Sequence, residues 1–227
     1  MSTGITNMMT MVLDERAVAI RRRLEELIVE NLHKIYRKNN LITHIEITDD
    51  FQFNLYQNAT YSKTELAFLM KNLGKEDFSN TIGSKSLSKL FEVYKVDEVA
   101  KLQKAMQEET EEAEFDLHKR IDISRLSKGE RQIFILSLYW AIIEISGKDI
   151  PFVIDTPYAR IDADHRKEIS EKFFPNISRQ VVILSTDEEI NEEFYGIIKS
   201  HIAQEYLLIN DESQNRTTVE NRYFFGA

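Results

Sequence analysis

The sequence predicts an α/β fold with a mostly parallel sheet flanked by helices. Three short apolar segments after residue 125, PFVID, QVVILS and EYLLI, have the length and composition of buried strands. Stretches of helical character separate them, at 125–146, 164–173 and 188–203. Strands that alternate with helices are typical of a parallel sheet covered on both faces.

Composition restricts the class of protein. The chain has 227 residues, 42% of them apolar, which suits one large domain or a domain with an appendage. Its formal charge of −9 repels nucleic acid overall, so any contact with DNA must be local. Cysteine is absent, which excludes disulfides and thiolate metal sites. The longest apolar run, 133–145, is too short to cross a bilayer and no signal peptide is evident, so we expect a soluble, cytoplasmic protein.

Residues 1–40 predict a helix with a narrow apolar seam. Apolar side chains recur along it in steps of four and three: Leu13, Ala17, Ile20, Leu24 and Leu27. This spacing is typical of the end of a coiled coil, and equally of a helix packed on a domain, because only two or three heptads are present. The arginines at 21–23 either contact a DNA backbone or face solvent.

The next two segments differ in character. Residues 41–61 predict a β-hairpin, since apolar residues alternate on both sides of Asp49 and Asp50. Residues 62–120 predict a helical insertion or subdomain, with helices at 63–72 and 86–115. The second helix ends in the acidic stretch EETEEAEFD, which is either a solvated face or a partner surface. The fourth segment, 121–227, is the α/β lobe.

The helix that begins near residue 128 has a polar start and an apolar body. Ser127 and Glu130 have the spacing of a capping box, and the N-terminus of a helix carries free N–H groups and a positive dipole end. Gly129 allows close approach of the backbone to a ligand, and a phosphate suits such a place. The alternative is a well-capped core helix without a ligand.

Acidic and hydroxyl residues follow the predicted strands. Asp155 ends PFVID, Asp162 comes seven residues later, and Ser185, Thr186 and Asp187 end QVVILS. The carboxyl ends of parallel strands meet at one edge of a sheet, where ligands bind. A carboxylate there is suited to Mg²⁺, although a turn-capping role is the alternative for Asp155.

These motifs resemble those of ABC-type ATPases. Residues 126–130 (LSKGE) resemble the LSxGE signature, 152–155 the Walker B strand, 159–162 the D-loop and 185–187 the switch strand. Their order is similar to the C-terminal lobe of the head domain in the SMC and recombination-repair branch. VIDTPYARID and QVVILSTDEEI are most similar to the DndD family, SMC-like ATPases of bacterial DNA phosphorothioation. The resemblance covers 121–190 well and 10–57 loosely, and leaves 62–120 unexplained.

The resemblance implies a nucleotide shared between two heads. ATP would lie between the Walker A loop of one head and the signature of its partner in a homodimer: Ser127, Lys128, Gly129 and Glu130. Asp155 would hold Mg²⁺. The implied catalytic group consists of Asp155, Thr156, Asp162, Thr186 and Asp187. DNA and other Dnd-type proteins are the expected partners.

Two departures from the family pattern change the expectation. No GxxxxGK[ST] loop is present, because LGKED and IGSKS lack the second glycine, so we expect half a head: a fragment or the product of a truncated gene, completed by a Walker A lobe from elsewhere. Thr156 replaces the usual glutamate after Walker B, and Thr186 the usual histidine. Both agree with the DndD-like pattern and predict slow hydrolysis, with Asp162 or Asp187 as the substitute carboxylate.

Two other functions stay open. One is a structural or interaction module that does not hydrolyse nucleotide, and the other is an SMC-like ATPase of another DNA repair or anti-phage defence system. Neither a metal-ligand spacing among the five histidines nor a serine nucleophile elbow is found.

Overall fold

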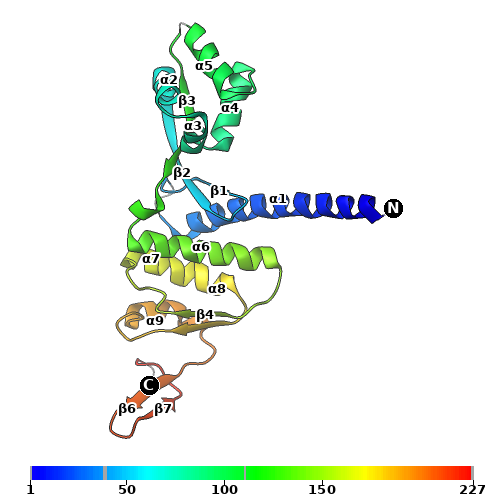
Figure 1. The fold of residues 1–227 in the computed structure, drawn as a ribbon. Helices are drawn as coiled ribbons and strands as arrows, with labels where there is room; N and C mark the ends of the chain where they lie inside the picture. Colours follow the sequence, from blue (N-terminus) through cyan, green and yellow to red (C-terminus); the bar gives the residue numbers. More distant parts are fainter. Residues whose placement is uncertain (1, 38–39, 110, 226–227) are drawn as a thin grey trace. The chain divides into compact units, whose positions relative to one another are not determined.

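The computed structural model describes residues 2–37, 40–109 and 111–225, which form two compact units (Figure 1). One unit comprises Met1–His33 and Arg37–Ser127, and the other comprises Lys34–Tyr36 and Lys128–Ala227. Apart from Lys34–Tyr36, the three N-terminal segments expected from the sequence therefore fall into one unit. The continuous C-terminal part of the second unit begins at Lys128.

The first unit is built on an antiparallel sheet in the order β1-β2-β3. Its elements are α1 (Ser2–Ile35), β1 (His44–Ile47), β2 (Phe53–Ser62), β3 (Glu114–Ile121) and the short η1 (Ile123–Arg125). The predicted hairpin is confirmed, with Ile47 opposite Phe53 next to the turn. β3 adds a third strand that pairs along β2 from Leu55 to Ser62.

The predicted helix over 86–115 is wrong. The chain instead forms α4 (Ser84–Tyr94) and α5 (Val99–Glu108), and β3 takes up the last residues of that range. Lys95 adopts the left-handed conformation, with φ of 52°, which ends α4. The residues of the acidic stretch have a high helix propensity. However, Leu117 is buried and β3 pairs with β2, so tertiary pairing overrides this propensity.

Four helices between β2 and β3 enclose a core of their own. α2 (Lys63–Asn72) has the predicted bounds and begins with a capping box between Ser62 and Glu65. α3 (Lys75–Ile82), α4 and α5 complete the group. Their buried core consists of Leu66, Met70, Phe78, Ile82, Leu90, Leu102, Met106 and Leu117. The helical subdomain expected from the sequence thus has a physical basis.

α1 packs on the hairpin through its C-terminal half only. Leu27, Ile28 and Leu32 are buried, and the Glu25 carboxylate accepts a hydrogen bond of 2.6 Å from the backbone N–H of Ile47. In contrast, residues 10–20 are exposed. The helix ends at Ile35, before the predicted end at Asn39 and Asn40; residue 39 lies outside the described residues.

The second unit contains the predicted α/β lobe. Its elements are α6 (Lys128–Ser146), β4 (Phe152–Asp155), α7 (Ala163–Glu168), the π-helical η2 (Ile169–Phe173), α8 (Phe174–Ile177), β5 (Val181–Leu184), α9 (Glu192–Ile198), η3 (Lys199–His201), β6 (Leu207–Asp211) and β7 (Arg216–Glu220). α6 agrees with the prediction and ends at Gly147, whose φ is +59°. α9 begins four residues later than predicted, after the cap at Asn191.

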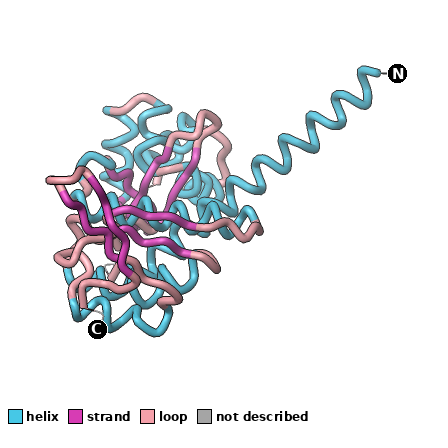
Figure 2. Tube along the Cα trace, turned by 90° about the horizontal axis from the view of Figure 1, so that it is seen from below, coloured by secondary structure: helices cyan, strands magenta, loops and turns pink. Residues whose placement is uncertain are grey.

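The prediction of a mostly parallel sheet holds for two strands only. β4 and β5 are parallel, with Asp155 opposite Leu184 (strands in Figure 2). Within the described residues, β6 pairs with β7 in a separate antiparallel hairpin. The Asp211 carboxylate accepts backbone hydrogen bonds from Ser213 and Gln214, which stabilises the turn between the two strands. β7 therefore folds back and pairs with β6.

Aromatic side chains form the core on one face of β4–β5. Phe173 contacts Trp140 of α6 and Phe152 of β4 edge-on, each with 5.7 Å between ring centroids. α1 contributes its last residues to this unit, since the Lys34 ammonium lies 4.7 Å from the centre of the Trp140 ring. No helix in the described ranges is long and apolar enough to cross a membrane.

Candidate functional site

The start of α6 lies against a turn of its own chain. Ser127 directly precedes the helix and is exposed. A Cβ atom on Gly129 would stand 2.6 Å from the carbonyl oxygen of Arg160. Glycine is therefore required here for a close backbone contact, and the group that approaches is the 156–160 turn, whereas the sequence suggested a phosphate.

That turn follows Asp155 and contains two residues in the left-handed region. Asp155 ends β4 and is exposed. Thr156 has φ of 48° and Arg160 has φ of 66°. Positive φ is uncommon for any residue other than glycine and costly for a β-branched one, so it persists only where surrounding contacts impose it.

Contacts from two neighbouring segments hold the turn. The Thr156 N–H donates to the Leu184 carbonyl at 2.9 Å. Gln132 of α6 donates from its side-chain amide to the Pro157 carbonyl at 3.1 Å. The Tyr158 N–H donates to the Glu189 carboxylate at 2.6 Å. α6, the end of β4 and the segment after β5 therefore meet at one place.

Glu189 is the functional candidate that the sequence did not indicate. Its side chain is only 9% exposed, and its Oε2 atom has no hydrogen-bond partner within the described part of the chain. Burial raises the pKa of Glu189, the Tyr158 and Ala159 amides and Arg166 oppose this, and Asp155 raises it further. The carboxylates of Glu189 and Asp155 thus repel each other across this turn.

Asp162 caps a helix. Its carboxylate accepts hydrogen bonds from the backbone N–H of His165, at 3.1 Å, and lies 2.6 Å from the His165 Nδ1 atom. Burial opposes ionisation, but the hydrogen bonds from His165 outweigh it and lower the pKa of Asp162. Both carboxylate oxygens are engaged, so Asp162 is already used as the N-cap of α7.

A second link connects the end of α1 to the same helices. The Tyr36 hydroxyl donates to the Glu130 carboxylate at 2.8 Å, and the Tyr36 ring stacks on His165 with 4.8 Å between centroids. Burial and the hydrogen bond to Glu130 raise the pKa of Tyr36. Glu130 of the signature-like motif is therefore tied to α1 through Tyr36.

Thr186 and Asp187 lie in the turn after β5 and are exposed. The Thr186 carbonyl accepts from the Tyr223 hydroxyl at 3.0 Å and from the N–H groups of Glu189 and Ile190, at 3.2 and 3.1 Å. The turn brings Glu189, two residues beyond Asp187, back toward the end of β4.

The acidic groups supply only part of the ligand set of a cation. Within the described ranges no three His, Asp or Glu side chains are arranged to hold a metal ion. Mg²⁺ in phosphate-transfer sites, however, commonly uses one or two carboxylates, several waters and phosphate oxygens. Asp155, whose charge acts on the Glu189 carboxylate, fits that mode of binding.

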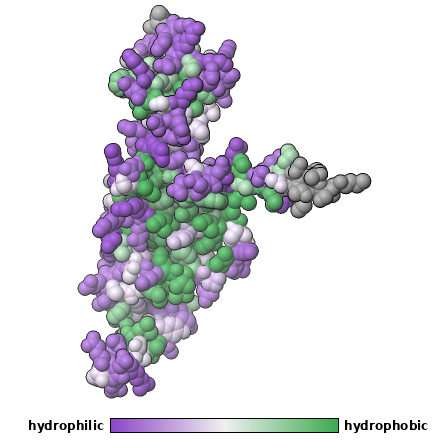
Figure 3. All heavy atoms as spheres, in the orientation of Figure 1, coloured by the Kyte–Doolittle hydropathy of each residue, from purple (hydrophilic) through white to green (hydrophobic). Residues whose placement is uncertain are grey.

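One surface of the second unit is apolar and open. On the outer face of β4–β5, Val153 is 61% exposed, Val182 38% and Leu184 48%. The apolar residues at 135, 139 and 142 form an exposed stripe on α6. Figure 3 shows hydrophobic atoms gathered over this unit. α6 is apolar on almost every side, and this stripe is its uncovered side.

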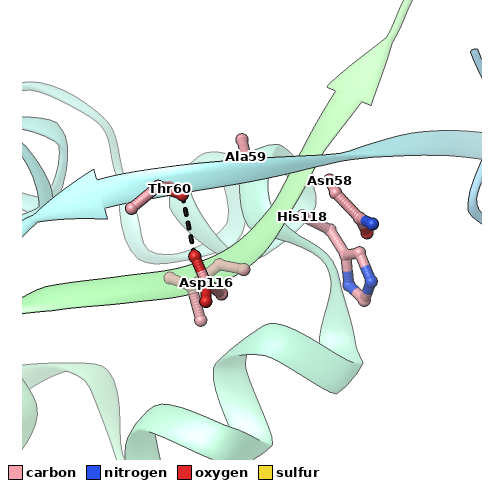
Figure 4. Close-up of a pocket in the computed structure, with 6 residues that line it drawn as sticks. Asn58, Ala59, Thr60, Asp116 and His118 are labelled. Carbon is pink, nitrogen blue, oxygen red and sulfur yellow. Dashed lines mark hydrogen bonds between the residues drawn. The ribbon is translucent and has the colours of Figure 1, made fainter. Parts of the chain in front are cut away.

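The first unit has a separate polar hollow of about 400 Å³ next to β2 and β3 (Figure 4). It is lined by Asn58, Ala59, Thr60, Asp116, Leu117 and His118. Burial, with repulsion from His44 and Lys85, lowers the pKa of His118 to about 4. The Ser86 hydroxyl, which does not line this hollow, lies 3.0 Å from His118 Nδ1 and accepts a hydrogen bond from the backbone N–H of His118. The His118 ring is therefore already partnered.

No protein-family model matches the sequence, and no curated protein matches it. Fold and site together define an α/β chain with a strand-end acidic site and an open apolar sheet face.

Proposed function

We propose that this chain is the C-terminal lobe of an SMC-like ATPase head. It binds ATP with Mg²⁺ at the interface of two heads and hydrolyses it slowly, and the resulting movement of α1 acts on DNA, in phosphorothioate modification. One observation carries the proposal: the start of α6, Asp155, the strained 156–160 turn and the segment after β5 meet at the carboxyl end of β4–β5. Ligands bind at such ends of parallel strands.

The open face of β4–β5 supports a missing lobe. Parallel strands are normally covered on both faces, whereas here one face exposes valine and leucine side chains. A Walker A lobe that packs on this face would cover them. Burial of such side chains is worth about 25 cal/mol per Å² of apolar area.

Each residue of the proposed site would have a separate role. Ser127, Lys128 and the backbone at the start of α6 would face the γ-phosphate of ATP bound on the partner head. Asp155 would hold Mg²⁺, which, when bound, neutralises charge on the phosphates. The Thr156 hydroxyl would orient the attacking water, since it is too weakly acidic to serve as a base at neutral pH.

α1 would transmit the state of the site. Tyr36 binds Glu130 and stacks on His165, so a shift of the α6 start would move the end of α1. In this proposal, Tyr36 would connect the nucleotide site to the end of α1.

The exposed apolar surface also favours a second candidate, an interaction module that docks partners and never hydrolyses nucleotide. ATP hydrolysis by a head completed with a Walker A lobe would distinguish the ATPase from the interaction module. Another DNA repair or defence role of the same ATPase class would retain the site and change only the DNA partner.

The decisive experiment completes the head. The chain is co-expressed with a Walker A lobe from the same genome, and dimerisation is followed by light scattering with and without Mg-ATP. Wild type should dimerise only with Mg-ATP, Ser127→Arg should not, and Ser200→Arg, at an exposed serine of η3, should behave as wild type. Equal dimerisation of wild type and Ser127→Arg would remove the trans site.

The same assembly tests Asp155. Asp155→Ala should abolish Mg-dependent nucleotide binding or turnover. Unchanged activity would exclude Asp155 from the site.

A further inference from the structure

Glu189 lies in the part of the chain that contacts the candidate site but carries no role in the function proposed above. β4 and β5 place Asp155 opposite Leu184. Five residues beyond Leu184, the chain turns back through the hydrogen bond from Glu189 N–H to the Thr186 carbonyl, at 3.2 Å. The Glu189 side chain then reaches Tyr158, three residues beyond Asp155.

The two oxygens of the Glu189 carboxylate are in different situations. Oε1 accepts the 2.6 Å hydrogen bond from Tyr158 N–H, which fixes the side chain. Oε2 is buried and has no hydrogen-bond partner in the described residues. Buried polar atoms normally have a partner, and an exception requires an explanation such as an absent water or ion.

Hydrogen bonding to Tyr158 does not explain why this residue is a carboxylate. A glutamine at the same position would accept the same hydrogen bond through its amide oxygen, without a buried charge next to Asp155. Arg166 offsets part of the cost of this charge, but burial and Asp155 still raise the pKa of Glu189, so the charge remains a cost that a cation next to both carboxylates would reduce.

We propose that Glu189 acts together with Asp155 on a hydrated divalent cation. Asp155 binds the cation directly, and Glu189 Oε2 accepts a hydrogen bond from a water on the cation. The inference rests on the proposed function, because it adds a residue to the same site. Mg²⁺ keeps several of its waters, and residues that hold those waters orient the ion without binding it. Glu189 is thus a positioning residue.

The first test uses the chain as it is and needs no nucleotide. Thermal unfolding is measured with and without Mn²⁺, for wild type, Glu189→Gln, Asp155→Asn and Glu188→Gln. Glu188 is the matched control, since it is the exposed neighbour of Glu189. Without metal, Glu189→Gln should unfold about 2–4 °C above wild type, because a repulsive buried charge is removed. Mn²⁺ should raise the midpoint of wild type and Glu188→Gln equally, that of Glu189→Gln less, and that of Asp155→Asn not at all.

The second test uses the head completed with a Walker A lobe. The Mg²⁺ concentration for half-maximal ATP binding should rise about tenfold or more in Glu189→Gln, as for loss of other outer-shell ligands, and should stay unchanged in Glu188→Gln. A role limited to the Tyr158 hydrogen bond would leave this value at the wild-type level, because glutamine preserves that bond.

The outcomes separate the two proposals. If Mn²⁺ shifts wild type and Glu189→Gln equally, or shifts neither, while the completed head still hydrolyses ATP, the role of Glu189 is wrong and the ATPase assignment stands. If the metal effect is found but the completed head never binds Mg-ATP, the cation site stands and the ATPase assignment is wrong.

Discussion

The backbone of Gly129 and the carbonyl oxygen of Arg160 are in direct contact, with room for a hydrogen atom but not for a methyl group between them. This contact joins the start of α6 to the turn that follows Asp155. Both segments would belong to the nucleotide site. They can lie this close together because residue 129 has no side chain.

Gly129→Ala should destabilise the chain. The new methyl group would lie 2.6 Å from a backbone oxygen that cannot rotate away, so the helix start or the turn must move. Overpacking of this kind costs about 1–3 kcal/mol. Urea unfolding measures the change.

The matched control is Gly196→Ala in α9, where nothing lies within 4 Å of the added atom. Alanine is favoured over glycine in a helix, so this variant should gain about 0.5–1 kcal/mol. Equal effects of the two substitutions would contradict the close contact at Gly129.

Thr156→Asn should stabilise the free chain. Thr156 has φ of 48°, and asparagine adopts that region more readily than a β-branched residue. We expect a gain of about 0.5–1 kcal/mol in the free energy of unfolding, and loss of turnover in a completed head, since the hydroxyl is removed. Thr217→Asn in β7 serves as control and should give no gain, because its strand conformation suits threonine.

Tyr36→Phe tests the link between α1 and α6. The variant retains the stacked ring and loses only the hydroxyl that donates to Glu130. The cost should be about 1 kcal/mol in urea unfolding. Tyr206→Phe changes a 57% exposed tyrosine and should alter stability by about 0.5 kcal/mol or less. If both variants unfold like wild type, the Tyr36–Glu130 hydrogen bond is not formed in solution.

Acid should destabilise the chain before its carboxylates titrate. The pKa of His118 is lowered to about 4, mainly by burial, from 6.5 in an unfolded chain. Between these values the unfolded state binds more protons, so stability is complete above pH 6.5 and falls as the pH approaches 4. His118→Gln should flatten this slope in urea unfolding at several pH values. His201→Gln, at an exposed histidine, should preserve it.

A second loss of stability should follow at lower pH. Burial opposes ionisation of Glu46, but hydrogen bonds from His44 and Ser84 lower its pKa to about 2. Its contribution is complete above pH 4.5 and is lost as the pH falls toward 2. In Glu46→Gln the second decrease should be absent, while the one due to His118 is retained.

Elements with a clear period could be predicted from the sequence. The hairpin, α2, α6, β4 and β5 all follow from alternation or helical spacing with capping and turn residues at their ends. The break at Lys95 could not, because no glycine or proline marks it, and β3 is formed from residues with acidic, helix-like composition. The residue pattern of a strand also does not indicate which strand it pairs with. For this reason β6 was expected in the parallel sheet, whereas it pairs with β7.

The residues of the candidate site, too, could be predicted from the sequence only in part. Asp155 follows from its place at a strand end, and Gly129 from its place in a helix start. Glu189 could not be found, because the residues at 187–189 are three consecutive acids of similar chemistry. Only the turn after β5 decides that the third of them points inward while the first two are exposed. The family resemblance remains a hypothesis that the completed head will test.

The exposed stretch at residues 10–20 of α1 offers an independent readout of assembly. An uncovered helix end is held by little besides its own backbone hydrogen bonds, so its amide protons should take up deuterium within seconds, unlike those beneath the hairpin. Slower uptake there on mixing with another coil would map the pairing seam residue by residue.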